Sequence, residues 1–211
     1  MRSTWVIVLL AALLSAACSS GTETSSNTAE ATPAAMPSRT AEPPFTPAPT
    51  TAPADEAASE SPADFKGTAS NTLKENPKAT GAVLLRDVRS AVHPNYDRVV
   101  FEFDGDQLPS YKIEYIDKPV RACGSGNVVP FAGEAWLSVL FTGANAHTEA
   151  GEPTIQDRTR SPNLTIVKDL KLICDFEAEV EWVMGAASPN RYRVLELKDP
   201  TRLVVDIKHN R

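Results

Sequence analysis

The residue with the clearest chemical signature is Cys18, which directly follows three small residues, Ser15 to Ala17. Arg2 is the only charge before an unbroken apolar run at residues 5–14. A basic start, a short apolar run and a small-residue cleavage site are typical of a secretory signal peptide. A cysteine at that site, as its thiolate, is the nucleophile that accepts a diacylglycerol. The sequence therefore predicts a signal peptide over residues 1–17 and a lipid anchor on Cys18.

Two other interpretations compete with lipidation. A transmembrane helix needs about 20 apolar residues, and residues 5–17 fall short of that length. Ordinary cleavage would leave Cys18 unexplained, although Ser15 stands where lipoprotein signals usually have leucine. Two acyl chains anchor a protein stably. We therefore expect the protein to be lipid-anchored at the extracytoplasmic face of the cell membrane, or in the outer membrane if the cell has two membranes.

Cys123 and Cys174 are the two remaining cysteines. In an exported domain, two cysteines are most simply a disulfide. Closing a loop of about 52 residues would stabilise the domain by roughly 4 kcal/mol. The alternative is a reactive thiol, but the residues around Cys123 match no cysteine transpeptidase motif.

The three histidines, His93, His147 and His209, lie in no recognised metal-binding or catalytic motif. The sequence lacks a zinc-type His or Cys spacing, a glycine-rich phosphate loop and a Gly-x-Ser-x-Gly elbow. We therefore expect no metal site, no cofactor and no catalytic residues, which makes a binding module the better hypothesis than an enzyme.

An acidic strip is formed by Glu177, Glu179 and Glu181, which alternate with apolar residues on one expected strand. Alternate residues of a strand share a face, so these carboxylates could hold a cation. The favoured interpretation is a solvated face whose carboxylates pair with arginines such as Arg191 or Arg193.

Residues 18–80 differ in composition from the rest of the chain. They contain more than half of its 17 prolines, with Phe45 and Phe65 as the only aromatic residues. Such a segment buries too little apolar surface to offset its ordering entropy. We predict a disordered linker that acts as a stalk.

Residues 81–211 are long enough for one domain. The chain carries a net charge of −6 at pH 7, so there is no electrostatic reason to expect a nucleic-acid partner. Apolar and polar residues alternate through most of this region, as at Val99, Phe101 and Phe103 with Glu102 opposite. Similar runs occur at 111–115, 135–141, 178–184 and 203–207, and further strands are expected at 83–91, 164–173 and 191–197. About eight short strands separated by turns predict an all-β fold, either a β-sandwich or an open barrel.

Two of these segments, 97–103 and 201–207, resemble each other. Each has an arginine, three apolar residues, an acid and an apolar residue in the same order. The similarity indicates two related half-sheets or is a coincidence among strand sequences.

Trp136 is expected to point away from the face shared by Leu137 and Val139. An outward tryptophan either stacks on a sugar or a partner protein, or caps the second side of the sandwich.

Three segments carry a resemblance to a known family: Tyr96–Phe103, Tyr111–Tyr115 and Asp199–Ile207. Over roughly residues 81–209 the chain resembles the AMIN-like domain of bacterial lipoproteins, which is related to the AMIN domain of cell-wall amidases and secretins. The resemblance implies a single β-sandwich of two sheets over residues 81–211, without catalytic activity. It also implies a role in positioning on peptidoglycan or at division sites.

The function expected from these observations is that of a lipid-anchored protein that binds peptidoglycan or an envelope protein. The candidate binding residues are Tyr96, Tyr111 and Trp136. One alternative is a small-molecule-binding lipoprotein that serves a transporter, and a less favoured one is a hydrolase.

Overall fold

The structure is a computed structural model that describes residues 65–77 and 81–210. Within these ranges the regular secondary structure consists of β-strands. No helix that is long and apolar enough to cross a membrane occurs there. The predicted signal peptide, the anchor at Cys18 and the linker as far as residue 64 lie outside the described residues.

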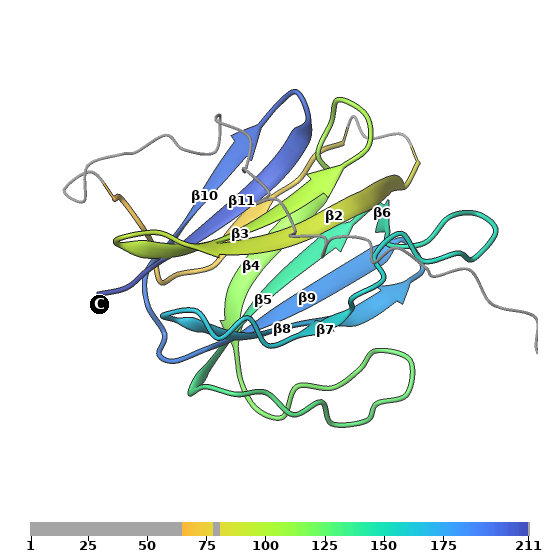
Figure 1. Ribbon diagram of the computed structural model, residues 1–211. Helices are drawn as coiled ribbons and strands as arrows, with labels where there is room; N and C mark the ends of the chain where they lie inside the picture. Colours follow the sequence, from red (N-terminus) through yellow and green to blue (C-terminus); the bar gives the residue numbers. More distant parts are fainter. Residues whose placement is uncertain (1–64, 78–80, 211) are drawn as a thin grey trace, which may run out of the picture. The chain divides into compact units, whose positions relative to one another are not determined.

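Eleven strands form the part of the chain that the structure describes (Figure 1). In chain order they are β1 (Thr72–Lys74), β2 (Val83–Val92), β3 (Tyr96–Phe103), β4 (Ser110–Ile116), β5 (Ala135–Thr142), β6 (Ala144–Asn145), β7 (Thr159–Arg160), β8 (Val167–Phe176), β9 (Glu179–Ala186), β10 (Tyr192–Leu197) and β11 (Thr201–Lys208).

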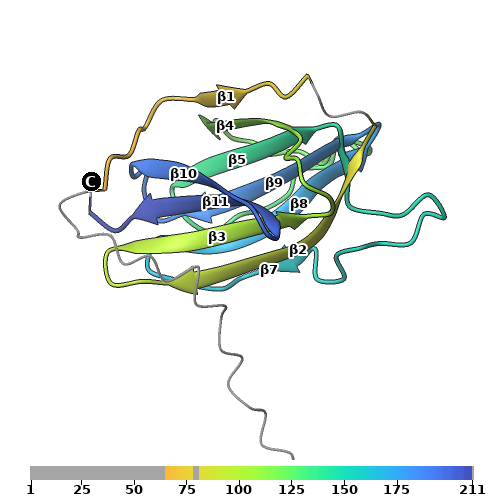
Figure 2. The same cartoon turned by 90° about the horizontal axis from the view of Figure 1, so that it is seen from above.

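The strands make two sheets that pack face to face (Figure 2). The six-stranded sheet has the order β1-β4-β5-β9-β8-β7, and the five-stranded sheet has the order β10-β11-β3-β2-β6. Neighbours are antiparallel except β2 and β6. The predicted all-β sandwich is therefore confirmed, and the strands beyond the expected eight are the short β1, β6 and β7.

The core lies between the two sheets and is built by the alternation seen in the sequence. Phe101 of β3 contacts Phe141 of β5, with ring centroids 5.2 Å apart, and Trp182 of β9, at 6.4 Å. All three side chains are fully buried. Leu203 and Val205 of β11 join the same core, so each predicted apolar face turns inward.

The domain begins earlier than predicted, because residues 65–77, here called the N-terminal segment, belong to the fold. β1 pairs with β4 (Figure 2), and Thr68 exchanges two backbone hydrogen bonds of 2.7 and 2.8 Å with Tyr192 of β10. The sandwich therefore includes residues that precede the predicted start at residue 81. The sequence did not indicate that this segment belongs to the fold, because the segment is polar and is held by hydrogen bonds rather than by a buried apolar face.

The predicted strand at 178–184 also begins later than expected. Glu177 and Ala178 have φ values of 51° and 60° and form the two-residue turn between β8 and β9. Positive φ at both central residues is the geometry of a type I′ hairpin. This turn usually contains asparagine and glycine, so the pair Glu-Ala gave no signal of it.

A second, smaller apolar cluster lies on the outer face of the six-stranded sheet. It is formed by Val120, Trp136, Ile173 and Val183. The loop between β4 and β5, residues 117–134, supplies Val120 and covers this face (Figure 1).

The β4–β5 loop is fixed at two points. Cys123 of the loop forms a disulfide with Cys174 of β8, with Cα atoms 5.2 Å apart, which confirms the predicted bridge. At the other end of the loop, Gly133 has a φ of 99°, and a Cβ there would collide with the backbone of Ala186. The loop therefore returns to the sheet in direct backbone contact with β9.

Candidate functional site

The three predicted binding residues lie in three different places. Tyr96 is on the outer face of the five-stranded sheet, Tyr111 lies between the sheets at their β1/β10 edge, and Trp136 is on the outer face of the six-stranded sheet. The structure therefore does not combine them into one site, and each has its own surroundings.

Tyr111 closes a network that joins three strands. Its hydroxyl donates to Glu196 Oε1 of β10 at 2.8 Å, and Lys74 Nζ of β1 donates to both carboxylate oxygens at 2.6 Å. Tyr111 and Glu196 lie within the predicted domain, whereas Lys74 comes from the N-terminal segment. Sequence reasoning missed Lys74 and Glu196, because only the pairing of β1 with β4 brings them together.

Burial and charge determine the protonation states in this network. Burial and the neighbouring Glu196 raise the pKa of Tyr111, so its hydroxyl remains a donor. Burial alone would raise the pKa of Glu196, but the hydrogen bonds from Lys74 and Tyr111 outweigh it and hold that pKa below its ordinary value. Glu196 is therefore a fixed anion at neutral pH.

An open cleft of about 270 Å³ lies beside this network. It is lined by two cations, two anions, two amides and several apolar groups. These are Lys74, Lys198, Asp106, Glu196, Asn76, Gln107, Leu108, Pro109, Tyr111, Leu197 and Thr201. The cleft thus offers charges of both signs next to an aromatic ring.

Tyr96 is enclosed by cations and aromatic rings. Its ring stacks on His93 with centroids 4.6 Å apart, and the guanidinium carbons of Arg98 and Arg193 each lie 5.2 Å from its centroid. Arg193 also lies 4.6 Å from the ring centroid of Phe65. Tyr96 is buried, so it acts as packing between arginines rather than as a free stacking surface.

Both arginines bind the same aspartate. Asp206 is fully buried, and it accepts hydrogen bonds from Arg98 Nε and Nη2 at 2.7 and 2.9 Å and from Arg193 Nε at 2.8 Å. A buried carboxylate requires such partners because desolvation of an unpaired charge is costly. This cluster stabilises the middle of the five-stranded sheet and was not predicted.

Trp136 packs in the outer cluster, on the second side of the sandwich. It is only 9 % exposed. Lys118 Nζ lies over the indole, 4.1 Å from the ring centroid.

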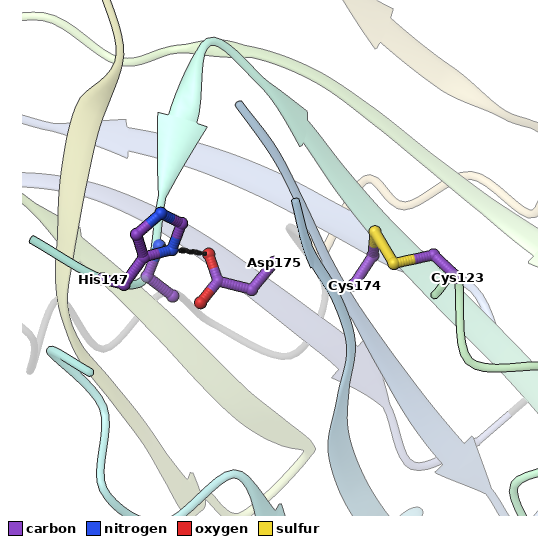
Figure 3. Close-up of a disulfide and its surroundings, with 5 residues drawn as sticks. Cys123, His147, Cys174 and Asp175 are labelled. Carbon is purple, nitrogen blue, oxygen red and sulfur yellow. Dashed lines mark hydrogen bonds and ion pairs between the residues drawn. A yellow bond between two sulfur atoms is a disulfide. The ribbon is translucent and has the colours of Figure 1, made fainter. Parts of the chain in front are cut away.

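Two His–Asp pairs lie among the described residues, and both hold backbone segments together. His147 Nδ1 lies 2.8 Å from Asp175 Oδ1, next to the disulfide (Figure 3). The same Asp175 also accepts the Ala146 N–H at 2.8 Å and Arg158 Nη2 at 3.1 Å. The carboxylate therefore ties the 146–158 loop to β8.

The second pair joins His209 Nε2 and Asp97 Oδ1 at 2.8 Å. Asp97 also accepts the backbone N–H groups of Ile166 and Val167 at 2.5 and 2.9 Å. In the described part of the chain no hydroxyl or thiol is hydrogen-bonded to the ring of His209 or His147. Neither pair has the nucleophile–base arrangement of a hydrolase.

The acidic strip differs from its prediction in two ways. Glu177 lies in the turn, and Glu181 accepts a hydrogen bond of 2.7 Å from Ser138 Oγ. Arg193, one of the two arginines expected to pair with the strip, pairs with Asp206 of the five-stranded sheet. Among residues 65–77 and 81–210 no group of three or more His, Cys, Asp or Glu side chains is placed to hold a metal ion.

Comparison with protein families gives one match. Residues 83–209 match the AMIN-like domain, from the first residue of β2 to just after β11. The chain belongs to the AMIN-like domain family. Neither the curated proteins nor the solved structures contain a match to it. The suspected family is thus confirmed, and it indicates an envelope-associated role outside the cytoplasm.

The matched region excludes the N-terminal segment. β1, Lys74 and Asn76 therefore lie outside the part that defines this AMIN-like domain. The cleft beside Tyr111 is built partly by the family fold and partly by this added segment.

Proposed function

We propose that the protein is a non-catalytic, lipid-anchored envelope protein whose AMIN-like sandwich binds peptidoglycan through the cleft beside Tyr111. The anchor is the diacylglycerol predicted on Cys18. An envelope protein that presents a similarly charged peptide is the second partner we consider, and the experiment below separates the two.

The observation that supports this proposal is the pairing of charges in the cleft. Glu196 is held ionised, and Lys74, its partner, is half-exposed and comes from a short edge strand. An ammonium group on a ligand can replace Lys74 at Glu196 while Lys198 remains for a carboxylate. Peptidoglycan stem peptides carry amino and carboxylate groups along one short chain, which fits this pattern of charges.

A non-catalytic role agrees with the use of the titratable groups. Asp97, Asp175 and Asp206 each bind backbone N–H groups or arginines that hold strands and loops together. The transporter alternative requires a concave apolar pocket. The apolar region between the sheets is instead filled by fully buried side chains such as Phe101 and Trp182.

The proposal is tested by sedimentation with isolated cell wall. Residues 18–211 with Cys18→Ser, which removes the lipid, are mixed with purified peptidoglycan, and the pelleted fraction is measured. We expect binding, and we expect Glu196→Gln to reduce it several-fold. Glu114→Gln is the matched control, because Glu114 lies on β4 and pairs with Lys112 away from the cleft.

If the chain that carries only Cys18→Ser fails to pellet with peptidoglycan, the peptidoglycan assignment is overturned. Recovery of one envelope protein by the same chain, lost in Glu196→Gln, would then identify the second partner. Equal pelleting of Glu196→Gln and Glu114→Gln would show that the cleft is not the binding site.

A further inference from the structure

The outer face of the six-stranded sheet carries a second hollow, about 220 Å³ in volume, under the β4–β5 loop. Its walls are Lys118, Pro119, Val120, Val128, Val129, Pro130, Phe131 and Trp136. We propose that this hollow is a subsite for one sugar ring that carries a free carboxylate, with Trp136 as the stacking surface and Lys118 as the anion's partner. The inference rests on peptidoglycan as the proposed ligand, but it concerns a different surface from the cleft.

Trp136 has the geometry of a stacking surface that is covered by a movable group. The indole is packed against Ile173 and Val183 of the sheet, which fixes the orientation of its ring. Lys118 Nζ lies 4.1 Å from the ring centroid and occupies the position that a sugar ring would take. The apolar face of a pyranose stacks on an aromatic ring as other flat apolar groups do.

Lys118 is able to move aside. Its side chain is exposed, and it forms no salt bridge with any residue of the described ranges. It is held over the ring only by a cation–π contact, which is weak at an exposed site. A long aliphatic stem keeps the ammonium within reach of a ligand that replaces it on the ring.

The charge at the hollow selects an anionic sugar over a neutral one. A second cation near the hollow, Lys171, lies 4.7 Å from the Phe131 ring and is neutralised by Asp169 at 2.9 Å. Lys118 therefore contributes one net positive charge beside an otherwise apolar hollow. A neutral sugar would displace this ammonium without pairing it, whereas a carboxylate on the sugar would form a charge-assisted hydrogen bond with it.

The walls are held in place before any ligand arrives. The Cys123–Cys174 disulfide fixes the tip of the loop, and Asp169 accepts the Ala132 N–H at 2.8 Å near its end. A rigid site loses less entropy on binding than a flexible one. Only the side chain of Lys118 needs to rearrange.

This chemistry corresponds to muramic acid from which the stem peptide has been removed. The lactyl carboxylate of this sugar is then free, whereas in intact peptidoglycan it forms an amide with the peptide. The hollow would thus bind glycan that has already been stripped, and the cleft beside Tyr111 would bind the stem peptide.

A matched pair of sugars tests the proposal. Isotope-labelled residues 18–211 with Cys18→Ser and the disulfide formed are titrated with N-acetylmuramic acid and with N-acetylglucosamine, which lacks the lactyl carboxylate. Trp136 and Trp182 are the two tryptophans in this part of the chain. The indole N–H resonance that is absent from the spectrum of Trp136→Phe is therefore that of Trp136. We expect N-acetylmuramic acid to shift that signal and to bind at least several-fold more tightly than N-acetylglucosamine.

Variants separate the two residues. Lys118→Met should abolish the preference for N-acetylmuramic acid and leave the weak binding of N-acetylglucosamine unchanged, while Trp136→Phe should weaken both. Lys112→Met, a lysine of β4 paired with Glu114 outside the hollow, is the control and should change neither. If Trp136→Phe does not fold, Lys118→Met alone decides the outcome.

Equal affinity for the two sugars, or no shift of the Trp136 signal, would overturn this proposal. Changes in chemical shift confined to residues around Tyr111 would overturn it too, because they would place the sugar in the cleft. The result is independent of the sedimentation test, since Glu196→Gln changes only the cleft and leaves Lys118 and Trp136 intact.

Discussion

Arg98 on β3 lies directly opposite Asp206 on β11 and forms two hydrogen bonds with it, of 2.7 and 2.9 Å. Four residue pairs further along, Glu102 lies opposite Arg202 in the same antiparallel register. The two similar sequence segments are therefore neighbouring strands. Because they run in opposite directions, the arginine of each lies opposite the acid of the other, which places opposite charges across the strand pair at both positions.

The first prediction concerns the buried aspartate of this pair. Asp206→Asn removes the charge that neutralises Arg98 and Arg193, and loss of one member of a buried ion cluster typically costs about 3–5 kcal/mol. We expect a decrease of that size in the free energy of unfolding, measured by urea denaturation. Asp157→Asn, at an exposed carboxylate that pairs with Arg160, should change it by less than about 1 kcal/mol. Equal effects of the two substitutions would contradict the role of Asp206.

Much of the fold could be predicted because side-chain alternation reports directly on a half-buried strand. Phe101, Leu137 and Val205 all face the core as the alternation indicates. The orientation of Trp136 away from that core followed from the same pattern. Its covering by Lys118 did not, since the path of the β4–β5 loop has no periodicity.

What could not be predicted depends on contacts between distant residues. The N-terminal segment carries no apolar pattern, and its place in the fold is decided by backbone bonds such as those of Thr68 with Tyr192. Lys74 and Glu196 are far apart in the sequence and meet only after β1 has paired with β4. The Asp206 cluster was similarly hidden, because the register of β3 with β11 is needed to see it.

A second prediction concerns the disulfide. Replacing Cys123 and Cys174 by serine should reduce the free energy of unfolding by about 4 kcal/mol, since the crosslink restricts the unfolded chain. Urea denaturation under oxidising conditions measures the difference. Adding a reductant to the unmodified chain should produce the same loss and should have no effect on the double variant. A reductant effect on the double variant would show that the loss has another cause.

A third prediction concerns the N-terminal segment. A chain that starts at residue 81 lacks the bonds of Thr68 with Tyr192 and of Lys74 with Glu196, and it leaves the edge of β4 unpaired. We expect it to be less stable than a chain starting at residue 65 by at least about 1 kcal/mol, roughly the net value of one hydrogen bond. It should also associate at high concentration through the free edge. Thermal denaturation and light scattering test both points, and identical behaviour of the two chains would contradict them.

A fourth prediction concerns Cys18. In the full-length chain, Cys18→Ser removes the thiol that the diacylglycerol requires. The protein should then move from the detergent-soluble membrane fraction to the aqueous fraction, and its mass should no longer include a lipid. Ser19→Ala is the control, because it leaves the thiol intact. A membrane-bound, lipid-free Cys18→Ser protein would show that another feature holds the chain at the membrane.

The last prediction concerns the pH dependence of the cleft. The pKa of Glu196 in the folded protein lies below its ordinary value, because hydrogen bonds from Lys74 and Tyr111 outweigh the effect of burial. A lowered carboxylate pKa adds stability that is fully present above the ordinary glutamate pKa and is lost as the pH falls towards the lowered value. The unmodified chain should therefore lose more stability than Glu196→Gln over that acidic interval.

Urea denaturation at a series of pH values measures this difference. Subtracting the curve of Glu196→Gln removes the contributions of other carboxylates with lowered pKa values, such as Asp169. The difference should be largest near neutral pH and should shrink as the pH falls, because protonated Glu196 resembles glutamine in charge. Glu114→Gln, in a partly exposed pair with Lys112, should give a nearly constant difference. If the curves of the unmodified chain and Glu196→Gln ran parallel at all pH values, Glu196 would not be the ionised centre of the cleft.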